Sequence, residues 1–244
     1  MTHTFYRVGN YTENNIVLNS ATYNYGKSFR NEYDHLLDSY FKVANQIDLP
    51  IDFLIHVSNG IASCGNDYLN GIKNAVVNEN FVNIFKVTNN EKHIGAVIPI
   101  NLLNEYIQSF DDDNQFKILA EGKYLWERYF EMVRKNVFPE LPSRKESIFL
   151  FDNIADCEFY ISNYKNGFGN IYEIEVIQKD ILFKADMDIY DKIDLSIKHN
   201  DLVKEMFKYW NEETSETPRY EYLFRGKCRV KKVLQQRITK WRDL

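Results

Sequence analysis

Residues 142–152 read PSRKESIFLFD, and residues 218–226 read PRYEYLFRG. In each stretch a proline and a few polar or charged residues lead into an apolar run that is typical of a β-strand. A third short run, FYRV at residues 5–8, lies near the start of the chain. The three predicted strands would carry an arginine (Arg7), a serine or arginine, and a glutamate (Glu221). Such side chains suit a site that holds a dinucleotide and stabilises positive charge on a sugar.

The rest of the chain places helices mainly before strands. Apolar residues at three- and four-residue steps predict helices over residues 29–47, 102–110 and 115–137. Residues 80–99 predict a hairpin, and Ser58–Gly71, rich in Gly, Asn and Ser, predicts a loop. The later strand candidates are residues 147–151, 171–177, 181–185, 220–225 and 228–234, with helices at 153–164, where Asn153 is a plausible N-cap, and 200–210. This order predicts an α+β fold with a mostly antiparallel sheet.

The composition is that of a folded chain without a disulfide or zinc framework. With 244 residues, 44% of them hydrophobic, the chain can form one large domain or a domain with a substantial insertion. The three cysteines are widely spaced, and the five histidines form no pair with metal-ligand spacing. No apolar run reaches the roughly 18 residues of a membrane span, and the first residues lack a signal-peptide core. We therefore expect a soluble, cytoplasmic protein without a metal.

The charge is distributed unevenly along the chain. From Arg219 onward nine basic residues face two acidic ones, so this segment carries +7, whereas residues 1–218 carry −12. A basic pair of strands could attract a pyrophosphate or a nucleic-acid backbone. A solvated outer face of a sheet would have the same composition, and both interpretations stay open.

Glu221 is the first candidate for chemistry. On a strand over residues 220–225, Glu221, Leu223 and Arg225 share one face, and three aromatic residues share the other. A carboxylate between aromatic neighbours can accept a hydrogen bond from a ribose hydroxyl and stabilise an oxocarbenium-like transition state. The alternative is a solvated charge on an edge strand.

An arginine and a polar cluster could complete the site. Arg7 has apolar neighbours, and its planar guanidinium fits a phosphate or a carboxylate; the alternative is an ion pair within the chain. Ser143 and Ser147 could orient an amide such as nicotinamide, and Arg144 could bind a phosphate. The alternatives for the two serines are turn formation after Pro142 and a satisfied hydroxyl on a strand.

Other residues and motifs have simpler interpretations. Glu131 and Arg134, three apart on a predicted helix, are expected to pair with each other or to support the site. Cys157 lies on an apolar helix face and reads as a core residue. The chain has no Gly-x-Ser-x-Gly elbow, no Walker-type loop and no Gly-x-Gly-x-x-Gly pattern, so it lacks the signatures of serine hydrolases, P-loop enzymes and Rossmann folds.

An ordered series of short motifs carries a resemblance to a known group. The motifs are FYRV (5–8), FE-x-x-R (130–134), FP-x-x-PSR (138–144), SIFLF (147–151), IYEIEV (171–176), ADM (185–187), YW (209–210) and E-x-L-x-x-G (221–226). The series resembles an uncharacterised bacterial domain family that is grouped with the mono-ADP-ribosyltransferases. It covers the first strand and most of residues 120–235. We interpret the chain as a single domain over residues 1–244, with residues 50–115 as an insertion.

The resemblance implies a split β-sandwich that binds NAD, as a substrate, in the cleft between two small sheets. By position, Arg7 matches the first-strand arginine that holds the ribose or phosphate of NAD. Ser147, or else Ser143, matches the serine of the second motif strand, and Glu221 matches the catalytic glutamate. The residues expected to contact NAD are Arg7, Tyr6, Ser143, Arg144 and Phe149.

Two positions depart from the pattern of that group. Ser147 stands alone where the group has a Ser-Thr-Ser triplet. Arg219 lies two positions before Glu221, where enzymes that modify arginine usually carry Gln or Glu, and it cannot act as the base for an acceptor. An acceptor other than arginine is therefore favoured, and a nucleic acid bound through residues 219–242 is one candidate.

The resemblance thus implies an NAD-dependent ADP-ribosyltransferase that modifies a protein or nucleic acid and releases nicotinamide, in a toxin-like role or in conflict with phage. Two alternatives stay open. An RNA 2′-phosphotransferase uses the same fold and NAD, and would be expected to use several basic and histidine residues. A catalytically inactive module of this fold would bind a nucleotide, a nucleic acid or a partner protein.

Overall fold

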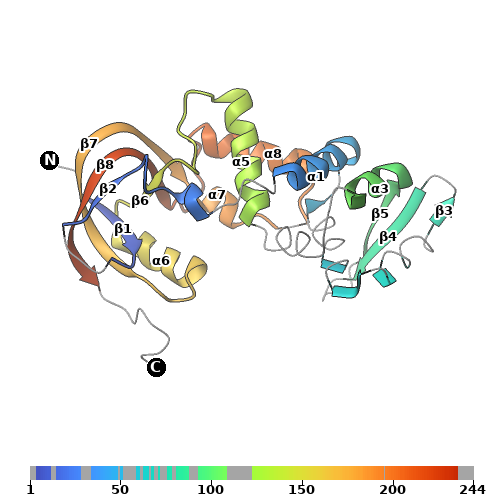
Figure 1. The fold of residues 1–244 in the computed structure, drawn as a ribbon, viewed down its shortest axis with the longest axis horizontal. Coiled ribbons are helices and arrows are strands. Elements are labelled where there is room, and N and C mark those ends of the chain that lie inside the picture. Colours follow the sequence, from blue (N-terminus) through green and yellow to red (C-terminus); the bar gives the residue numbers. More distant parts are fainter. Residues whose placement is uncertain are drawn as a thin grey trace. The chain divides into compact units, whose positions relative to one another are not determined.

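The computed structural model describes residues 4–11, 15–28, 34–48, 50–51, 59–60, 63–65, 67–68, 71, 76–78, 81–87, 93–108, 123–194 and 196–235. The chain forms two compact units, coloured along the sequence in Figure 1. The first comprises Met1–Phe29, Phe130–Lys192 and Met206–Leu244, and the second comprises Arg30–Tyr129 and Ile193–Glu205. The fold combines helices with antiparallel sheets, so it is α+β as expected, but helices and strands alternate along the chain and the helices do not come mainly first.

The first unit is built on a five-stranded antiparallel sheet. Its strands are β1 (Phe5–Gly9), β2 (Val17–Asn19), β6 (Ile148–Leu150), β7 (Asn170–Asp186) and β8 (Tyr220–Gln235). The order is β1-β7-β8-β2, and β6 pairs with β8 outside this path. The two long, curved strands β7 and β8 run side by side along the whole unit (Figure 1).

β8 changes its second partner along its length. Residues 222–224 pair with β6, and residues 227–229 pair with β2. Gly226 lies between these two parts at a φ of 135°, and a Cβ atom there would lie 2.1 Å from the carbonyl oxygen of Gln178 on β7. Only glycine fits this bend, because it combines a positive φ with close approach of two backbones.

The continuity of β7 and β8 corrects the expectation of two strands in each stretch. The sequence suggests breaks near residues 178–180 and 226–227, where polar residues and a glycine interrupt the apolar runs. In the structure the β7–β8 register shifts between Val176 and Gln178 and again between Lys179 and Ile181, but pairing continues on both sides. A bulge therefore bends the ladder where the sequence predicts a turn. A bulge and a turn both interrupt the alternation of apolar and polar residues, so the sequence pattern does not distinguish them.

β1 also reaches β6. The backbone N–H of Tyr6 donates to the carbonyl of Phe151 at 2.7 Å, and the N–H of Phe151 donates to the carbonyl of Tyr6 at 2.8 Å. β6 thus lies next to β1 through this bridge and next to β8 through its ladder. The strands predicted to carry the arginine, the serine and the glutamate are therefore neighbours.

Helices and apolar side chains cover the faces of this sheet. α6 (Ile154–Tyr164) starts at Asn153, whose side chain accepts a hydrogen bond from the N–H of Asp156 at 2.8 Å, as an N-cap should. A short helix, α7 (Asp188–Asp191), and a 3-10 turn over Tyr25–Ser28 complete the unit. One buried cluster joins β1, β2, β6, β7 and β8 and contains Phe5, Leu18, Ile148, Leu150, Tyr172, Ile174, Tyr222, Phe224, Cys228 and Val230. The predicted core position of Cys157 is confirmed, because its side chain is fully buried against α6 neighbours and β1.

The second unit contains α1 (Asp34–Ile47), α3 (Ile100–Gln108) and a three-stranded sheet of β3 (Val76–Asn78), β4 (Phe81–Val87) and β5 (His93–Pro99). α5 (Lys123–Val137) and α8 (His199–Trp210) each contribute one end to this unit and the other end to the first. Its core includes His199, which is bonded to the Tyr129 hydroxyl at 2.6 Å and to the Asn45 side chain at 2.7 Å. The predicted hairpin over residues 80–99 is confirmed by the β4–β5 ladder.

Two other predictions for this unit can be compared with the structure only in part, because some of their residues are not described. The starts of the helices predicted at 29 and 115 lie outside them, since α1 is described from Asp34 and α5 from Lys123. The loop predicted over Ser58–Gly71 is wrong where the structure describes it, because residues 59–60, 63–65, 67–68 and 71 are helical. Gly, Asn and Ser disfavour helix only weakly, and tertiary packing overrides such a preference. Within the described part of the chain, the helices are too short or too polar to cross a bilayer.

Candidate functional site

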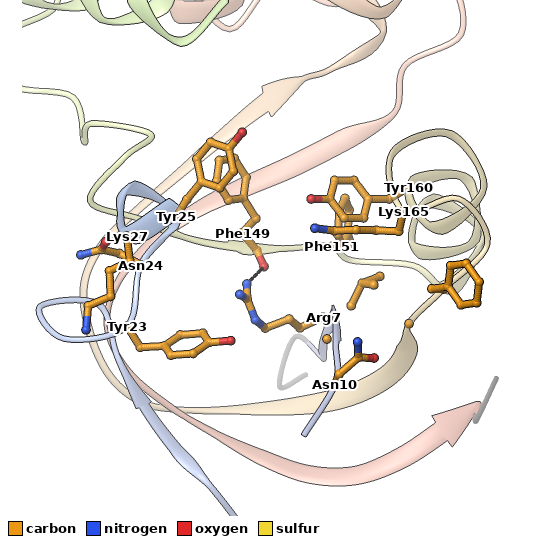
Figure 2. A pocket seen from close by; sticks show the side chains of 14 residues that line it. Arg7, Asn10, Tyr23, Asn24, Tyr25, Lys27, Phe149, Phe151, Tyr160 and Lys165 are labelled. Atoms are coloured by element: carbon orange, nitrogen blue, oxygen red, sulfur yellow. Dashed lines mark hydrogen bonds between the residues drawn. The ribbon is translucent and has the colours of Figure 1, made fainter. Parts of the chain in front are cut away.

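A pocket of about 480 Å³ opens beside the end of β1 in the first unit (Figure 2). Segments from four parts of the chain line it: β1 and the residue after it, the stretch before and within the 3-10 turn, the β6 region, and α6 with its connection to β7. The lining residues are Arg7, Val8, Gly9, Asn10, Tyr23, Asn24, Tyr25, Lys27, Phe149, Phe151, Tyr160, Lys165, Phe168 and Gly169. We call this the Arg7 pocket.

Arg7 projects into the pocket and is fixed by neutral groups. Its Nη1 donates to the carbonyl oxygen of Phe149 at 2.7 Å, which Figure 2 shows as a dashed line, and its Nε donates to the Tyr11 hydroxyl at 2.6 Å. The guanidinium carbon lies 5.6 Å from the centre of the Tyr23 ring. Among the described residues no carboxylate pairs with Arg7, and its side-chain partners are the hydroxyls of Tyr11 and Tyr23. The ion-pair alternative therefore finds no support there.

Aromatic rings lie on both sides of Arg7. In the view of Figure 2, Tyr23 and Tyr25 lie on one side of its side chain, and Tyr160 lies on the other. The Tyr25 ring packs edge-on against Phe149, with the ring centres 5.0 Å apart. A cation between two groups of rings can receive a phosphate while the rings stack on planar groups to either side.

The pocket is positive. Besides Arg7 it contains Lys27, from the 3-10 turn, and Lys165, at the C-terminal end of α6, whose ammonium lies 5.7 Å from the centre of the Tyr160 ring. No aspartate or glutamate is among the described lining residues. The electrostatic field therefore favours an anion over a cation as ligand.

Glu221 lies outside this lining, at the start of β8. Its side chain is 4% exposed, and Oε1 contacts both Nη1 of Arg144 and the hydroxyl of Tyr209, the latter at 2.7 Å. We call these three residues the Glu221 cluster. β8 is flanked by β7 and β6 at this point, so the alternative of a solvated charge on an edge strand is wrong.

Arg144 is held in this cluster by aromatic rings. Its guanidinium carbon lies 4.3 Å from the centre of the Phe130 ring, 4.9 Å from that of Phe149 and 5.3 Å from that of Tyr209. Such stacking stabilises a buried guanidinium. Burial raises the pKa of Tyr209; the nearby Arg144 lowers it, and the nearby Glu221 raises it further. The hydroxyl of Tyr209 therefore stays protonated and donates.

Phe149 connects the Arg7 pocket with the Glu221 cluster. Its ring lines the pocket and stacks on Arg144, and its carbonyl accepts from Arg7. Phe149 pairs with Leu223 across the β6–β8 ladder, and paired residues project to the same face of a sheet. Because Glu221 is two residues from Leu223, it lies on the face that Phe149 shares with the pocket.

The two serines and Tyr6 shape the β6 region. Ser147 is fully buried, and its hydroxyl donates to the carbonyl oxygen of Ser143 at 2.7 Å. Ser143 is also buried, and Tyr6 packs beside Phe151, where β1 bridges to β6. None of these three residues lines the described pocket, whereas Arg7 and Phe149 do.

The segment before β6 is tied to α5. Nε and Nη2 of Arg134 form a bidentate pair with the carboxylate of Glu131, at 2.9 and 2.8 Å, which confirms the expected pairing. Nη1 of Arg134 donates to the carbonyls of Pro139 and Leu141. Arg134 and Ser143 lower the pKa of Glu131, although burial opposes them. This clamp fixes the turn that leads to Arg144.

Arg219 forms ion pairs with two aspartates and stacks on an aromatic ring. Its Nη2 lies 2.7 Å from Asp188 and 3.0 Å from Asp191, and its guanidinium stacks on Phe159 at 3.7 Å. The carboxylate of Asp186 accepts from the backbone N–H groups of Arg219 at 3.0 Å and of Ser215 at 2.7 Å. The chain just before Glu221 is therefore anchored to the end of β7.

The basic residues of β8 face glutamates on neighbouring segments. Arg229 pairs with Glu175, and Lys231 and Lys232 pair with Glu173, all at 3.1 to 3.2 Å. The basic side chains and Glu175 are exposed, as the solvated-face interpretation expects, whereas the side chain of Glu173 is 18% exposed. Residues 236–242 of the basic segment lie outside the described residues.

Sequence reasoning missed several residues of the site. Tyr209, Tyr11, Tyr23, Tyr25, Lys27 and Lys165 all contact or line it. Tyr209 belongs to a predicted helix, and the others to stretches without periodicity, so no local pattern marks them. Among the described residues, no three His, Cys, Asp or Glu side chains come together as metal ligands would.

A comparison with models of known protein families found a match. A family model described as protein of unknown function (DUF2441) matches residues 55–236, well over half of the chain. The chain belongs to the DUF2441 family. The match includes β6, β7 and β8 with the whole Glu221 cluster, and also most of residues 50–115. It begins after β1, so Arg7 lies outside the matched residues. No curated protein matches the chain.

Proposed function

We propose that this DUF2441 protein is an NAD-dependent ADP-ribosyltransferase that transfers ADP-ribose to a macromolecular acceptor and releases nicotinamide. The observation that carries the proposal is Arg7, a cation without a carboxylate partner among the described residues, in a pocket between two groups of aromatic rings. The resemblance noted in the sequence, and the neighbouring positions of β1, β6 and β8, support it further.

The Arg7 pocket fits the chemistry of a dinucleotide. Arg7 would bind the pyrophosphate through its guanidinium, while the rings of Tyr25 and Tyr160 would stack on the two planar ends of NAD. Lys27 and Lys165 would add attraction for the phosphates. A volume of about 480 Å³ lies within the range of small-molecule sites.

Glu221 would supply the catalytic carboxylate. It would accept a hydrogen bond from a ribose hydroxyl and stabilise the cation that forms as the bond between C1′ and the nicotinamide nitrogen breaks. Nicotinamide leaves as a neutral molecule with the electron pair of that bond. A nucleophilic atom of the acceptor then attacks C1′ and loses its proton.

The test is nicotinamide release from NAD, measured with cell extract as a source of acceptors. We expect release by the wild type, loss of release in Glu221→Gln with NAD binding retained, and weakened NAD binding in Arg7→Met. Glu175→Gln, which neutralises an exposed glutamate on β7, is the matched control and should retain full release. Release that is unchanged in Glu221→Gln would remove this residue from the mechanism.

One observation favours a second function, a nucleotide-binding module without turnover. Glu221 is buried in an ion pair with Arg144 and is not part of the pocket lining, so a nucleotide confined to the described lining would not contact its carboxylate. Binding of NAD that depends on Arg7, with no nicotinamide release in the presence of extract, would favour this module over the transferase.

The acceptor and the biological role are proposed on the resemblance. A toxin-like role or a role in conflict with phage follows from it alone. Arg219 is engaged by Asp188 and Asp191, which agrees with an acceptor other than arginine. Labelled NAD, followed by protease or nuclease treatment of the modified extract, would distinguish a protein acceptor from a nucleic acid.

A further inference from the structure

The Glu221 cluster engages only one oxygen of its carboxylate. Both the guanidinium of Arg144 and the hydroxyl of Tyr209 contact Oε1. Arg144 also donates to the Tyr209 hydroxyl at 2.5 Å, so the three groups form a closed triangle of hydrogen bonds. Among the described residues, Oε2 has no polar partner. One oxygen is thus fixed, and the other remains able to accept.

Arg144 is itself held in one orientation. The rings of Phe130, Phe149 and Tyr209 lie within 5.3 Å of its guanidinium, and its side chain is 7% exposed. Arg144 is not expected to bind a phosphate in addition, because turning toward it would leave the buried carboxylate of Glu221 without its ion-pair partner. Arg144 is also absent from the pocket lining, which Arg7 enters instead.

We propose that Arg144 and Tyr209 are positioning residues that fix the Glu221 carboxylate by Oε1 and keep Oε2 for a ribose hydroxyl. This inference rests on the proposed transferase function and replaces the expectation that Arg144 contacts a phosphate of NAD. Tyr209 supplies direction, since its hydroxyl lies 2.7 Å from Oε1. Arg144 supplies the charge that makes a buried carboxylate tolerable.

The experiment compares NAD affinity with turnover in purified full-length variants. Tyr209→Phe removes only the hydroxyl, Arg144→Lys keeps the charge without the planar fork, and Arg144→Met removes both. We expect the Kd for NAD to change by no more than about twofold and kcat to fall by about a hundredfold in Tyr209→Phe, as for a misplaced catalytic group. Arg144→Lys should retain more of kcat than Arg144→Met.

Tyr222→Phe is the matched control, because it removes a hydroxyl from the residue next to Glu221. That hydroxyl donates to Asp152 at 2.8 Å and does not contact the carboxylate of Glu221. We expect this variant to keep both the Kd and the kcat of the wild type. A merely structural role of Tyr209 would give the two tyrosine variants the same small effect on kcat, and that result would overturn the inference.

Two further outcomes would also overturn it. A large rise in the Kd for NAD in Arg144→Lys, with kcat little changed, would make Arg144 a phosphate ligand, and the transferase function would stand. A wild type that neither binds nor cleaves NAD would remove the transferase function and this inference together. Circular dichroism of Tyr209→Phe and Arg144→Lys ensures that the comparison is made between folded proteins.

Discussion

The carboxylate of Glu221 is paired with Arg144 in a part of the sheet that water hardly reaches. From sequence alone, a glutamate on a strand can equally be a solvated charge or a site residue. Burial decides between these, because a buried charge without a partner costs several kcal/mol, whereas a paired one is tolerated. At the scale of one residue, the structure therefore shows that Glu221 is a buried carboxylate paired with Arg144 and not a solvated surface charge.

The first prediction concerns the stability of Glu221→Gln. The sequence suggests that an amide at an exposed position would cost little. Because Glu221 is buried, replacing its charge breaks a buried ion pair with Arg144, and we expect the free energy of unfolding to fall by about 3 kcal/mol. Urea denaturation measures this value.

The control for this prediction is Glu175→Gln. That residue pairs with Arg229 on the outer face, with 46% of its side chain exposed, and we expect its change to cost less than about 1 kcal/mol. Equal losses in the two variants would contradict a buried ion pair at Glu221.

The second prediction is a pH dependence set by Asp191. Burial raises the pKa of Asp191 to about 6, although Arg219 opposes the shift. Since the folded chain holds this proton more tightly than the unfolded chain, the resulting stabilisation is present below about pH 4 and is lost as the pH rises through about 6. We expect Asp191→Asn to flatten the dependence of the urea midpoint on pH in this window.

Asp180→Asn is the comparison, because Asp180 is exposed on β7. It should retain the wild-type dependence on pH. A wild-type slope that persists in Asp191→Asn would assign the dependence to another group.

At the scale of single elements, bends in β7 and β8 place the site. The bend at Gly226 lets the first part of β8 pair with β6 and the second part with β2. The first part carries Glu221, and β6 carries Phe149, so this change of partner brings the cluster and the pocket into one sheet. The hydrogen bond from the Gly226 N–H to Ser20 Oγ, at 3.0 Å, fixes the bend from the β2 side.

The third prediction is that Gly226→Ala disrupts this bend. The added Cβ atom would lie 2.1 Å from a backbone oxygen that cannot move without breaking the ladder, in addition to the cost of a positive φ. We expect the free energy of unfolding to fall by about 3 kcal/mol or more, as measured by thermal and urea denaturation.

Gly167→Ala separates the two causes in this prediction. Gly167 also has a positive φ, of 82°, but nothing lies within 4 Å of the position of its Cβ atom. We expect it to lose only about 1 kcal/mol. Similar losses at both glycines would show that the backbone angle, and not the clash with β7, sets the cost.

Elements with a strong local signal agree with the sequence. α6 begins after its predicted N-cap, Asn153, and β4 and β5 form the predicted hairpin. β2, β3 and α7 are three or four residues long, too short to leave a periodic pattern, and were not predicted. β2 nevertheless pairs with the second part of β8, so a segment with a weak local signal takes part in the main sheet.

At the scale of the whole molecule, the uneven charge of the sequence is partly neutralised by folding. The basic side chains of β8 lie beside the glutamates of β7 because the two strands pair along their full length. Exposed pairs of this kind contribute little to stability, but they reduce the field available to a polyanion.

The fourth prediction is that β8 does not bind nucleic acid strongly. We expect fluorescence anisotropy with a short RNA to give the same weak signal for the wild type and for the double variant Lys231→Gln, Lys232→Gln at low salt. A tight signal that falls steeply between about 50 mM and about 200 mM salt and is lost in the double variant would instead support a nucleic-acid acceptor.

The sequence by itself determined the class of the fold and a set of candidate residues. Alternating and helical periodicities are local properties of the chain, so they predict antiparallel strands, α6 and the hairpin without tertiary information. The same periodicities identify Arg7, Arg144 and Glu221 as charged residues in or beside apolar runs. Local patterns do not record which of these residues meet.

Only the tertiary structure decided the partners of those residues. Arg7 meets Phe149, and Arg144 meets Glu221, across 142 and 77 positions of the chain. Such contacts depend on the register of β6 against β8 and on the bend at Gly226, which the side-chain pattern of either strand leaves open. Arg7 therefore faces a pocket and Arg144 faces a carboxylate because long-range strand pairing, and not local sequence, sets which charge is neutralised inside the fold.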